Sequence, residues 1–130
     1  MFLTAAILSS CGHDDTADET PAFTMSSDDA VAAFLDNQEA ATKKYVDQII
    51  QISGPIMELQ KENGNVVGVK LSSDEFNIVN VSLQYPTTAD EISESDGIVT
   101  IKGVCSGFLG DSESMLPGGT VELKRATFVQ

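Results

Sequence analysis

The chain has 130 residues, of which seven are Lys or Arg and twenty are Asp or Glu, so its formal net charge is −13 at pH 7. This length suits one ordinary domain and is short for two. The charge argues against a general nucleic acid-binding protein, because affinity for the phosphate backbone comes from Lys and Arg. With 42% hydrophobic residues the chain can build a core. No apolar run reaches the roughly 20 residues of a membrane-spanning helix.

The N-terminus has the pattern of a bacterial export signal. Residues 1–11 (MFLTAAILSSC) are too short to span a bilayer but suit the apolar part of a signal peptide. Their end, LSSC, resembles a lipobox, in which the cysteine after small residues receives the lipid and becomes the mature N-terminus. We therefore expect lipidation at Cys11 and anchoring in the bacterial cell envelope, in the outer membrane on its periplasmic or surface face. The alternative is an apolar strand or helix with an incidental cysteine.

One part of such a signal is missing, namely the positively charged start. The first basic residue is Lys43, which favours a start codon upstream of Met1. After the cysteine, residues 12–25 have the composition of a flexible acidic tether: residues 12–29 hold six carboxylates, no Lys or Arg, and Pro21. Acidic residues at this place also resemble the surface-export signal of some outer-membrane lipoproteins, with a plain solvated linker as the alternative.

Residues 26–130 are predicted to form the folded domain, which begins with a helix. Ser26 is a typical N-cap, and Asp28 and Asp29 follow in the first turn, where the helix dipole favours carboxylates. Apolar residues at helical spacing then continue to Lys43 and Lys44, which suit the last turn. We expect one helix that lies across one end or side of a β domain.

From Tyr45 onward the hydrophobic period becomes two, which predicts strands. Gly54-Pro55 should bend or bulge the first strand, because proline cannot donate to a sheet ladder and glycine has no Cβ. Asn63-Gly64 is a strong hairpin signal. In the second predicted strand the alternation places Val67, Val69 and Leu71 on one face. In the third it points four residues toward the core: Val79, Val81, Leu83 and Tyr85. The predicted strands cover residues 45–59, 66–71, 76–85, 98–109 and 120–129.

Five short strands with a long, bent first strand predict a mainly β fold, namely a five-stranded OB-fold-type Greek-key barrel with an N-terminal α-helix. An open sandwich is the alternative. Cys105 lies in an apolar strand and is expected to be a buried core residue, with no disulfide partner if Cys11 carries lipid. Six aromatic residues are also expected in the core: Phe34, Tyr45, Phe76, Tyr85, Phe108 and Phe128.

Three stretches of the domain resemble the tRNA_anti-like family of bacterial OB-fold proteins. Residues 43–54 (KKYVDQIIQISG) are similar to the opening of that family, residues 99–107 (VTIKGVCSG) to a later strand, and residues 121–126 (VELKRA) to the final strand. Many members carry a lipoprotein signal followed by a helix. Ala126 stands where many relatives have a cysteine, so a family disulfide to the position of Cys105 would be absent here. The family name implies nucleic acid binding, which for exported members is an analogy from fold.

The sequence offers no set of residues for catalysis. The only histidine, His13, lies in the tether, and the carboxylates of residues 90–96 are typical of a solvated loop. Asp111 and Glu113 alone would hold a cation only weakly, and no zinc, phosphate-loop or nucleotide motif is present. We therefore expect no enzyme activity, no cofactor and no metal site.

OB-folds bind ligands on the face of their second and third strands and at the neighbouring loops. On this chain that face carries one cation and no aromatic residue, whereas binders of single-stranded nucleic acid need both. We expect a non-catalytic envelope module that binds a protein, peptide or glycan. The alternative is a single-stranded nucleic acid-binding protein. The candidate ligand-binding residues are Asn63, Gly64, Lys70, Asn80, Ser82 and Gln84.

Overall fold

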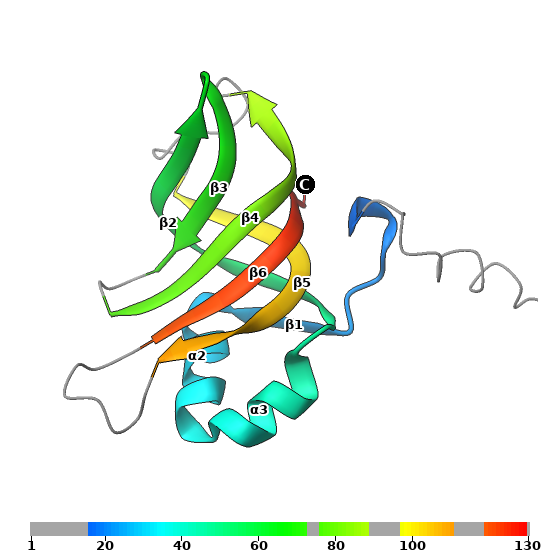
Figure 1. Cartoon of the computed structure of the whole chain (residues 1–130), viewed down its shortest axis with the longest axis vertical. Helices are drawn as coiled ribbons and strands as arrows, with labels where there is room; N and C mark the ends of the chain where they lie inside the picture. Colours follow the sequence, from blue (N-terminus) through cyan, green and yellow to red (C-terminus); the bar gives the residue numbers. More distant parts are fainter. Residues whose placement is uncertain (1–15, 73–75, 89–96, 111–118, 130) are drawn as a thin grey trace, which may run out of the picture.

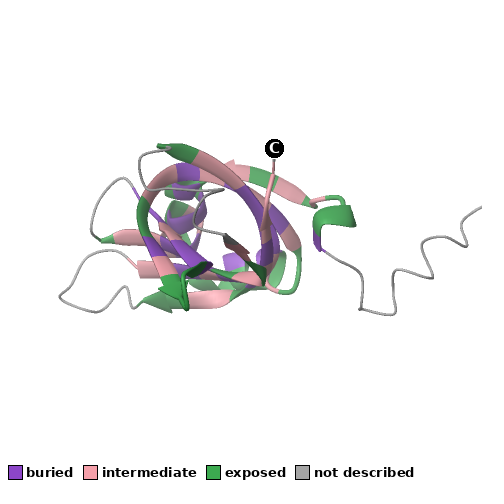
Figure 2. Ribbon diagram, turned by 90° about the horizontal axis from the view of Figure 1, so that it is seen from above, coloured by how far each residue is buried: buried purple, intermediate pink, exposed green. Residues whose placement is uncertain are grey.

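The computed structural model describes residues 16–72, 76–88, 97–110 and 119–129, and five of its strands close into a barrel (Figure 1). The strand order is β2-β3-β4-β6-β5, and the pairing of β5 with β2 completes the ring, which Figure 2 shows from above. β4 and β6 run parallel, and the other neighbours in the ring are antiparallel. This is the predicted OB-fold-type barrel. The strands are β2 (Ile49–Glu62), β3 (Asn65–Leu71), β4 (Asn77–Thr88), β5 (Ile98–Gly110) and β6 (Gly119–Phe128).

The long strand β2 belongs to both halves of the barrel. Its residues 49–55 pair with β5, and its residues 56–62 pair with β3. Gly54 and Pro55 do not interrupt it; the pairing with β3 shifts at two places further along, between Ile56 and Glu58 and between Gln60 and Lys61. The need for glycine at position 54 has a different cause from the expected bend. A Cβ on Gly54 would lie 2.8 Å from the Cβ of Ser27, so the first residue of a helix packs directly on the strand.

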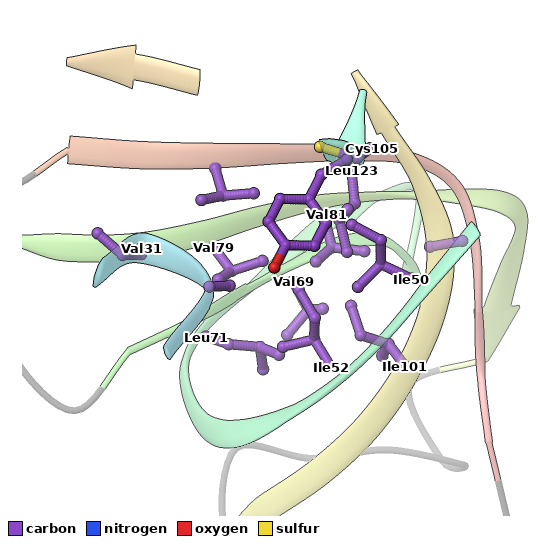
Figure 3. Packing of buried hydrophobic residues seen from close by; sticks show 14 of the residues in the cluster. Val31, Ile50, Ile52, Val69, Leu71, Val79, Val81, Ile101, Cys105 and Leu123 are labelled. Carbon is purple, nitrogen blue, oxygen red and sulfur yellow. The ribbon is translucent and has the colours of Figure 1, made fainter. Parts of the chain in front are cut away.

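The interior is filled by the inward-facing side chains of all five strands (Figure 3). Cys105 is fully buried among them, as predicted. In β3 the register shifts between Val66 and Gly68, so Val66 is buried in place of Val67. The buried hydrophobic residues of the strands are Ile50, Ile52, Leu59, Val66, Val69, Leu71, Val79, Val81, Ile101, Cys105, Val121, Leu123 and Ala126.

Two of the aromatic residues expected in the core are not there. Tyr85 is 61% exposed and Phe76 is 48% exposed. Tyr85 lies beyond the last paired residues of β4 and β6, which are Leu83 and Ala126, and Phe76 precedes the first residue of β4. The period of two places Tyr85 on the inner face with Val79 and Val81, but the pairing of β4 with β6 ends before Tyr85 and leaves its side chain uncovered. Phe76 falls on the opposite face by the same period and lies outside the strand.

The single helix expected after Ser26 is two helices, α2 (Ser27–Asp36) and α3 (Gln38–Tyr45). Ser26 caps α2 as predicted, because its Oγ accepts a hydrogen bond from the amide of Asp29 at 3.1 Å. Asn37 breaks the helix with an extended backbone (φ −157°), and its Oδ1 accepts from the amide of Ala40 at 3.0 Å. One asparagine therefore ends α2 and caps α3.

Helix α2 closes one end of the barrel. Phe34 is buried there and stacks on Phe108 with ring centroids 5.0 Å apart and an interplanar angle of 4°. Tyr45, from the last turn of α3, lies 6.0 Å from the same Phe34 ring. Figure 1 shows both helices gathered at this end, where β5 ends and β6 begins. None of the described helices combines the length and the hydropathy of a membrane span.

The segment before α2 was expected to be a tether over residues 12–25, and from Thr16 onward the structure places it against the barrel. It contains a short 3-10 turn, η1 (Thr16–Asp18), and a strand, β1 (Phe23–Ser26), that pairs in parallel with β2. The Phe23 ring meets Tyr45 edge to face at 4.9 Å. Phe23 and Met25 alternate with exposed polar residues, a strand pattern that is too short to stand out in an acidic stretch.

Candidate functional site

The face of β3 and β4 carries a row of polar side chains that crosses four strands. Lys70 pairs in register with Glu58 on one side and with Asn80 on the other, and Asn80 pairs with Glu122. Register partners in a sheet point to the same side and lie next to each other. Because Val79 and Val81 are buried, Asn80 and its partners face outward. We call Glu58, Lys70, Asn80 and Glu122 the polar row.

The polar row combines hydrogen-bond donors and acceptors, and its two carboxylates outnumber its one ammonium group. Asn80 Nδ2 donates to Glu122 Oε2 at 2.8 Å, while Asn80 Oδ1 is buried with no hydrogen-bond partner among the residues described. Lys70 is the one cation of the row and stands between a carboxylate and an amide. This arrangement suits a polar ligand that forms hydrogen bonds, and it offers a phosphate chain no cationic track.

The other predicted ligand-binding residues are distributed around this row. Ser82 is exposed on β4, two residues beyond Asn80. Asn63 and Gly64 form the turn between β2 and β3, both with positive φ (53° and 85°), so this position strongly favours asparagine and glycine for conformational reasons alone. The turn is exposed at the far end of the barrel from α2 (Figure 1).

Gln84, the last predicted binding residue, contacts the chain's own N-terminal segment. Its Oε1 accepts a hydrogen bond from the amide of Thr16 at 2.9 Å. On β5, beyond the intervening β6, Lys102 Nζ donates to the carbonyl oxygens of Ala17 at 2.9 Å and Glu19 at 2.6 Å. Lys102 is only 9% exposed and Thr16 1%. We call residues 16–19, held in this way, the latch.

Sequence reasoning missed Lys102, although the signal was present. A lysine in the middle of the apolar strand Ile98–Gly110, between Ile101 and Gly103, is unusual unless its ammonium group has partners. The partners are backbone carbonyls of a segment more than 80 residues away in sequence, and no local pattern indicates them.

A pocket of about 550 Å³ opens at the end of the barrel opposite α2. It forms where β4 and β6 separate: their pairing shifts between Val81 and Leu83, and Arg125 in β6 has a positive φ of 52°. No charged residue of the described chain lines the pocket, and Tyr85 and Ile98, 61% and 72% exposed, are part of its wall. The lining residues are Leu83, Tyr85, Pro86, Thr87, Ile98, Val99, Thr100, Ala126, Thr127, Phe128 and Val129.

The described residues offer little for catalysis or metal binding. Within them, no three His, Cys, Asp or Glu side chains are close enough to hold a metal ion. Burial raises the pKa of the Cys105 thiol, with a smaller contribution from the Asp47 carboxylate, while a backbone hydrogen bond from Gly107 opposes the rise. A thiol in this state is protonated at neutral pH and poorly nucleophilic. The predictions for Cys11, His13, residues 90–96, Asp111 and Glu113 lie outside the described residues.

Comparison with known proteins identifies the family of this chain. The model of the tRNA_anti-like family matches residues 5–116. The chain therefore belongs to the tRNA_anti-like family. No curated protein matches it in sequence.

One of three similar solved structures supports the fold. A Klebsiella pneumoniae protein described as a candidate nucleic acid-binding lipoprotein is similar over 100% of both chains, with a TM-score of 0.55 and 14% identity. A DUF3299 family protein from Pseudomonas aeruginosa covers 78% of this chain and 80% of its own, with a TM-score of 0.39 and 15% identity. A candidate aspartyl-tRNA synthetase from Leishmania major covers 96% of this chain and 25% of its own, with a TM-score of 0.39 and 9% identity. The last two similarities are too low to support a conclusion.

Proposed function

We propose that this protein is an exported, lipid-anchored OB-fold module that binds a polar partner of the cell envelope without catalysis. The polar row is the observation that carries the proposal. Lys70 and Asn80 lie on the second and third strands of the barrel, which OB-folds use for binding, and Glu58 and Glu122 lie in register beside them on β2 and β6. Together they present amide, ammonium and carboxylate groups in one line. A peptide or glycan that forms hydrogen bonds fits this chemistry. The lipobox at Cys11 and the lipoprotein description of the Klebsiella relative support the anchor.

The binding face can be tested with a photo-crosslinking side chain placed at Ser82, beside the polar row, in cells that make the protein. The matched control carries the same side chain at Thr42, which is exposed on α3. We expect a distinct crosslinked product from position 82 alone, weakened by Lys70→Ala. The same products from both positions, unchanged by Lys70→Ala, would contradict the assignment of this face.

Binding of single-stranded nucleic acid is the second candidate function. It is favoured by the family name and by the description of the Klebsiella relative. The net charge of −13 and the two carboxylates of the polar row oppose it. Fluorescence anisotropy with labelled single-stranded DNA and RNA, at low and at physiological salt, separates the candidates. We expect no binding at physiological salt. Micromolar binding that survives this salt and is lost in Lys70→Glu would favour the nucleic acid function.

A further inference from the structure

The N-terminal segment leaves the barrel beside the pocket. Gln84, which holds the amide of Thr16, directly precedes Tyr85 in β4. Lys102, which holds the carbonyls of the latch, pairs in register with Thr127 of β6. Tyr85 and Thr127 both line the pocket. η1 packs against β5 and β6, and Figure 1 shows it on the side of the C-terminus.

The latch shortens the connection to the proposed lipid. Four residues, 12–15, separate Cys11 from Thr16. The five backbone steps between these two residues span at most about 17 Å when fully extended. Strand β5, with 13 residues, runs for about 40 Å, so the connection through residues 12–15 is less than half as long as this strand. Lys102, which holds the latch, is the fifth of the 13 residues of β5 counted from the pocket end, so this short connection leaves the barrel nearer to the pocket than to α2.

The pocket end of the barrel, next to this connection, has the chemistry of a membrane-contacting surface. Tyr85 is a largely exposed aromatic side chain with a polar tip, which is the kind of group enriched at membrane–water interfaces. Ile98 is a large apolar side chain that is 72% exposed, and no described charged residue lines the pocket between them. Residues 89–96, which connect β4 to β5 at this end, carry four carboxylates, and the whole chain has a net charge of −13, so anionic headgroups would repel it. The contact is therefore expected with zwitterionic headgroups, through the described pocket lining, which holds no charged residue.

We infer that the pocket end of the barrel rests on the bilayer surface, with Tyr85 and Ile98 at the membrane–water interface. This orientation depends on the lipid anchor of the proposed function and adds to it which surface the anchor presents to the membrane. The polar row then lies on the side of the barrel, where a partner in the envelope can reach it. Apolar contacts of this kind add to the affinity of a lipid anchor and fix the angle at which the domain stands.

A matched pair of tryptophan reporters tests the orientation, because the chain contains no tryptophan. Ile98 and Leu109 lie near opposite ends of β5 and are similarly exposed, 72% and 64%. Chains of residues 11–130 carrying Ile98→Trp or Leu109→Trp keep every described element. Each is coupled through the Cys11 thiol to a maleimide lipid in vesicles of brominated phosphatidylcholine, while the buried Cys105 is protected from the reagent. The bromine atoms quench a tryptophan that touches the bilayer.

We expect the tryptophan at position 98 to lose most of its fluorescence and the one at position 109 to lose little. In a Lys102→Met background the latch is released, and the quenching at position 98 should fall to the level at position 109. Equal quenching of the two reporters, or quenching unchanged by Lys102→Met, would overturn the inference. Chemical coupling supplies the anchor in this experiment, so the outcome does not depend on natural lipidation, which the mass of the natural chain tests separately.

Discussion

The two ends of the barrel differ in how far the interior is covered. At one end, α2 covers the interior with Phe34, and the ring stack with Phe108 completes the core. At the other end, β4 and β6 separate and leave a pocket in whose wall Tyr85 and Ile98 remain exposed. The closed end therefore contributes stability, whereas the open end leaves apolar surface available for contact with something outside the chain. Phe108, which completes the core, and Ile98, which is exposed at the pocket, lie near opposite ends of one strand, β5.

The largest difference between the ends should appear in an alanine substitution at the closed end. Phe34→Ala removes a fully buried ring and should lower the free energy of unfolding by about 3–5 kcal/mol. Ile98→Ala at the open end removes a side chain that is already in solvent, so it should change this free energy by less than about 0.5 kcal/mol. Urea unfolding measures both. Equal effects would contradict the distinction.

The contact between α2 and β2 should give the next largest effect. Gly54→Val places a Cβ against the side chain of Ser27, and overpacking of this kind costs about 1–3 kcal/mol, or more where the backbone cannot move. Ser27→Gly in the same chain removes the opposing Cβ and should restore part of the loss. An unchanged melting temperature for Gly54→Val would count against the close packing of α2 on the barrel.

Much of this organisation follows from the sequence, and the exceptions share a cause. The five strands and the N-cap at Ser26 were predicted because alternation and capping are local signals. The helix break at Asn37 had a local signal too, because asparagine is a preferred N-cap residue. This asparagine lies inside a continuous helical pattern, which hid the break. β1 was missed because its four residues follow an acidic stretch that resembles a linker.

The surfaces were less predictable than the strands. Lys70, Asn80 and Ser82 were placed correctly on the outer face by the period of two. The use of Gln84 and Lys102 to hold the latch depends on contacts between segments 68 or more residues apart. The pocket depends on a register shift in β6 and on where β4 and β6 part, and the exposure of Tyr85 follows from it. These features depend on contacts and register between strands that are distant in the sequence, so no pattern within a single strand predicts them.

The latch offers a smaller and more local effect at the open end. Lys102→Met keeps the apolar stem but removes the two hydrogen bonds to Ala17 and Glu19, and hydrogen bonds from charged groups are each worth about 1.5–3 kcal/mol. We expect the amides of Thr16 and Glu19 to exchange with solvent at least about tenfold faster, since 1.4 kcal/mol corresponds to a factor of ten. Lys61→Met, at the exposed end of β2, is the control and should leave both amides unchanged. Hydrogen exchange measured by NMR gives the comparison, and no change in Lys102→Met would show that the ammonium does not hold the segment.

The smallest effect concerns Cys105 and appears only in alkali. Burial raises the pKa of its thiol above the 9.0 of an unperturbed cysteine, so the folded chain keeps this proton after the unfolded chain has lost it. The free energy of unfolding should therefore be independent of this group below pH 9.0 and should decrease as the pH rises through the pKa of the folded state. Cys105→Ala should lack this part of the decrease. Urea unfolding of both chains between pH 7 and pH 10.5 measures the difference, and parallel curves would contradict the burial of the thiol.

The anchor at Cys11 is the central claim, because it places the protein in the envelope and gives the two ends of the barrel different surroundings. The most direct test is the intact mass of the protein isolated from the membrane fraction of the bacterium that makes it, with Cys11→Ser as the control. We predict a chain that begins at Cys11 and carries a diacylglyceryl group on its sulfur, and a control that remains unmodified and unprocessed at this position. A natural chain that retains residues before an unmodified Cys11 would contradict the account.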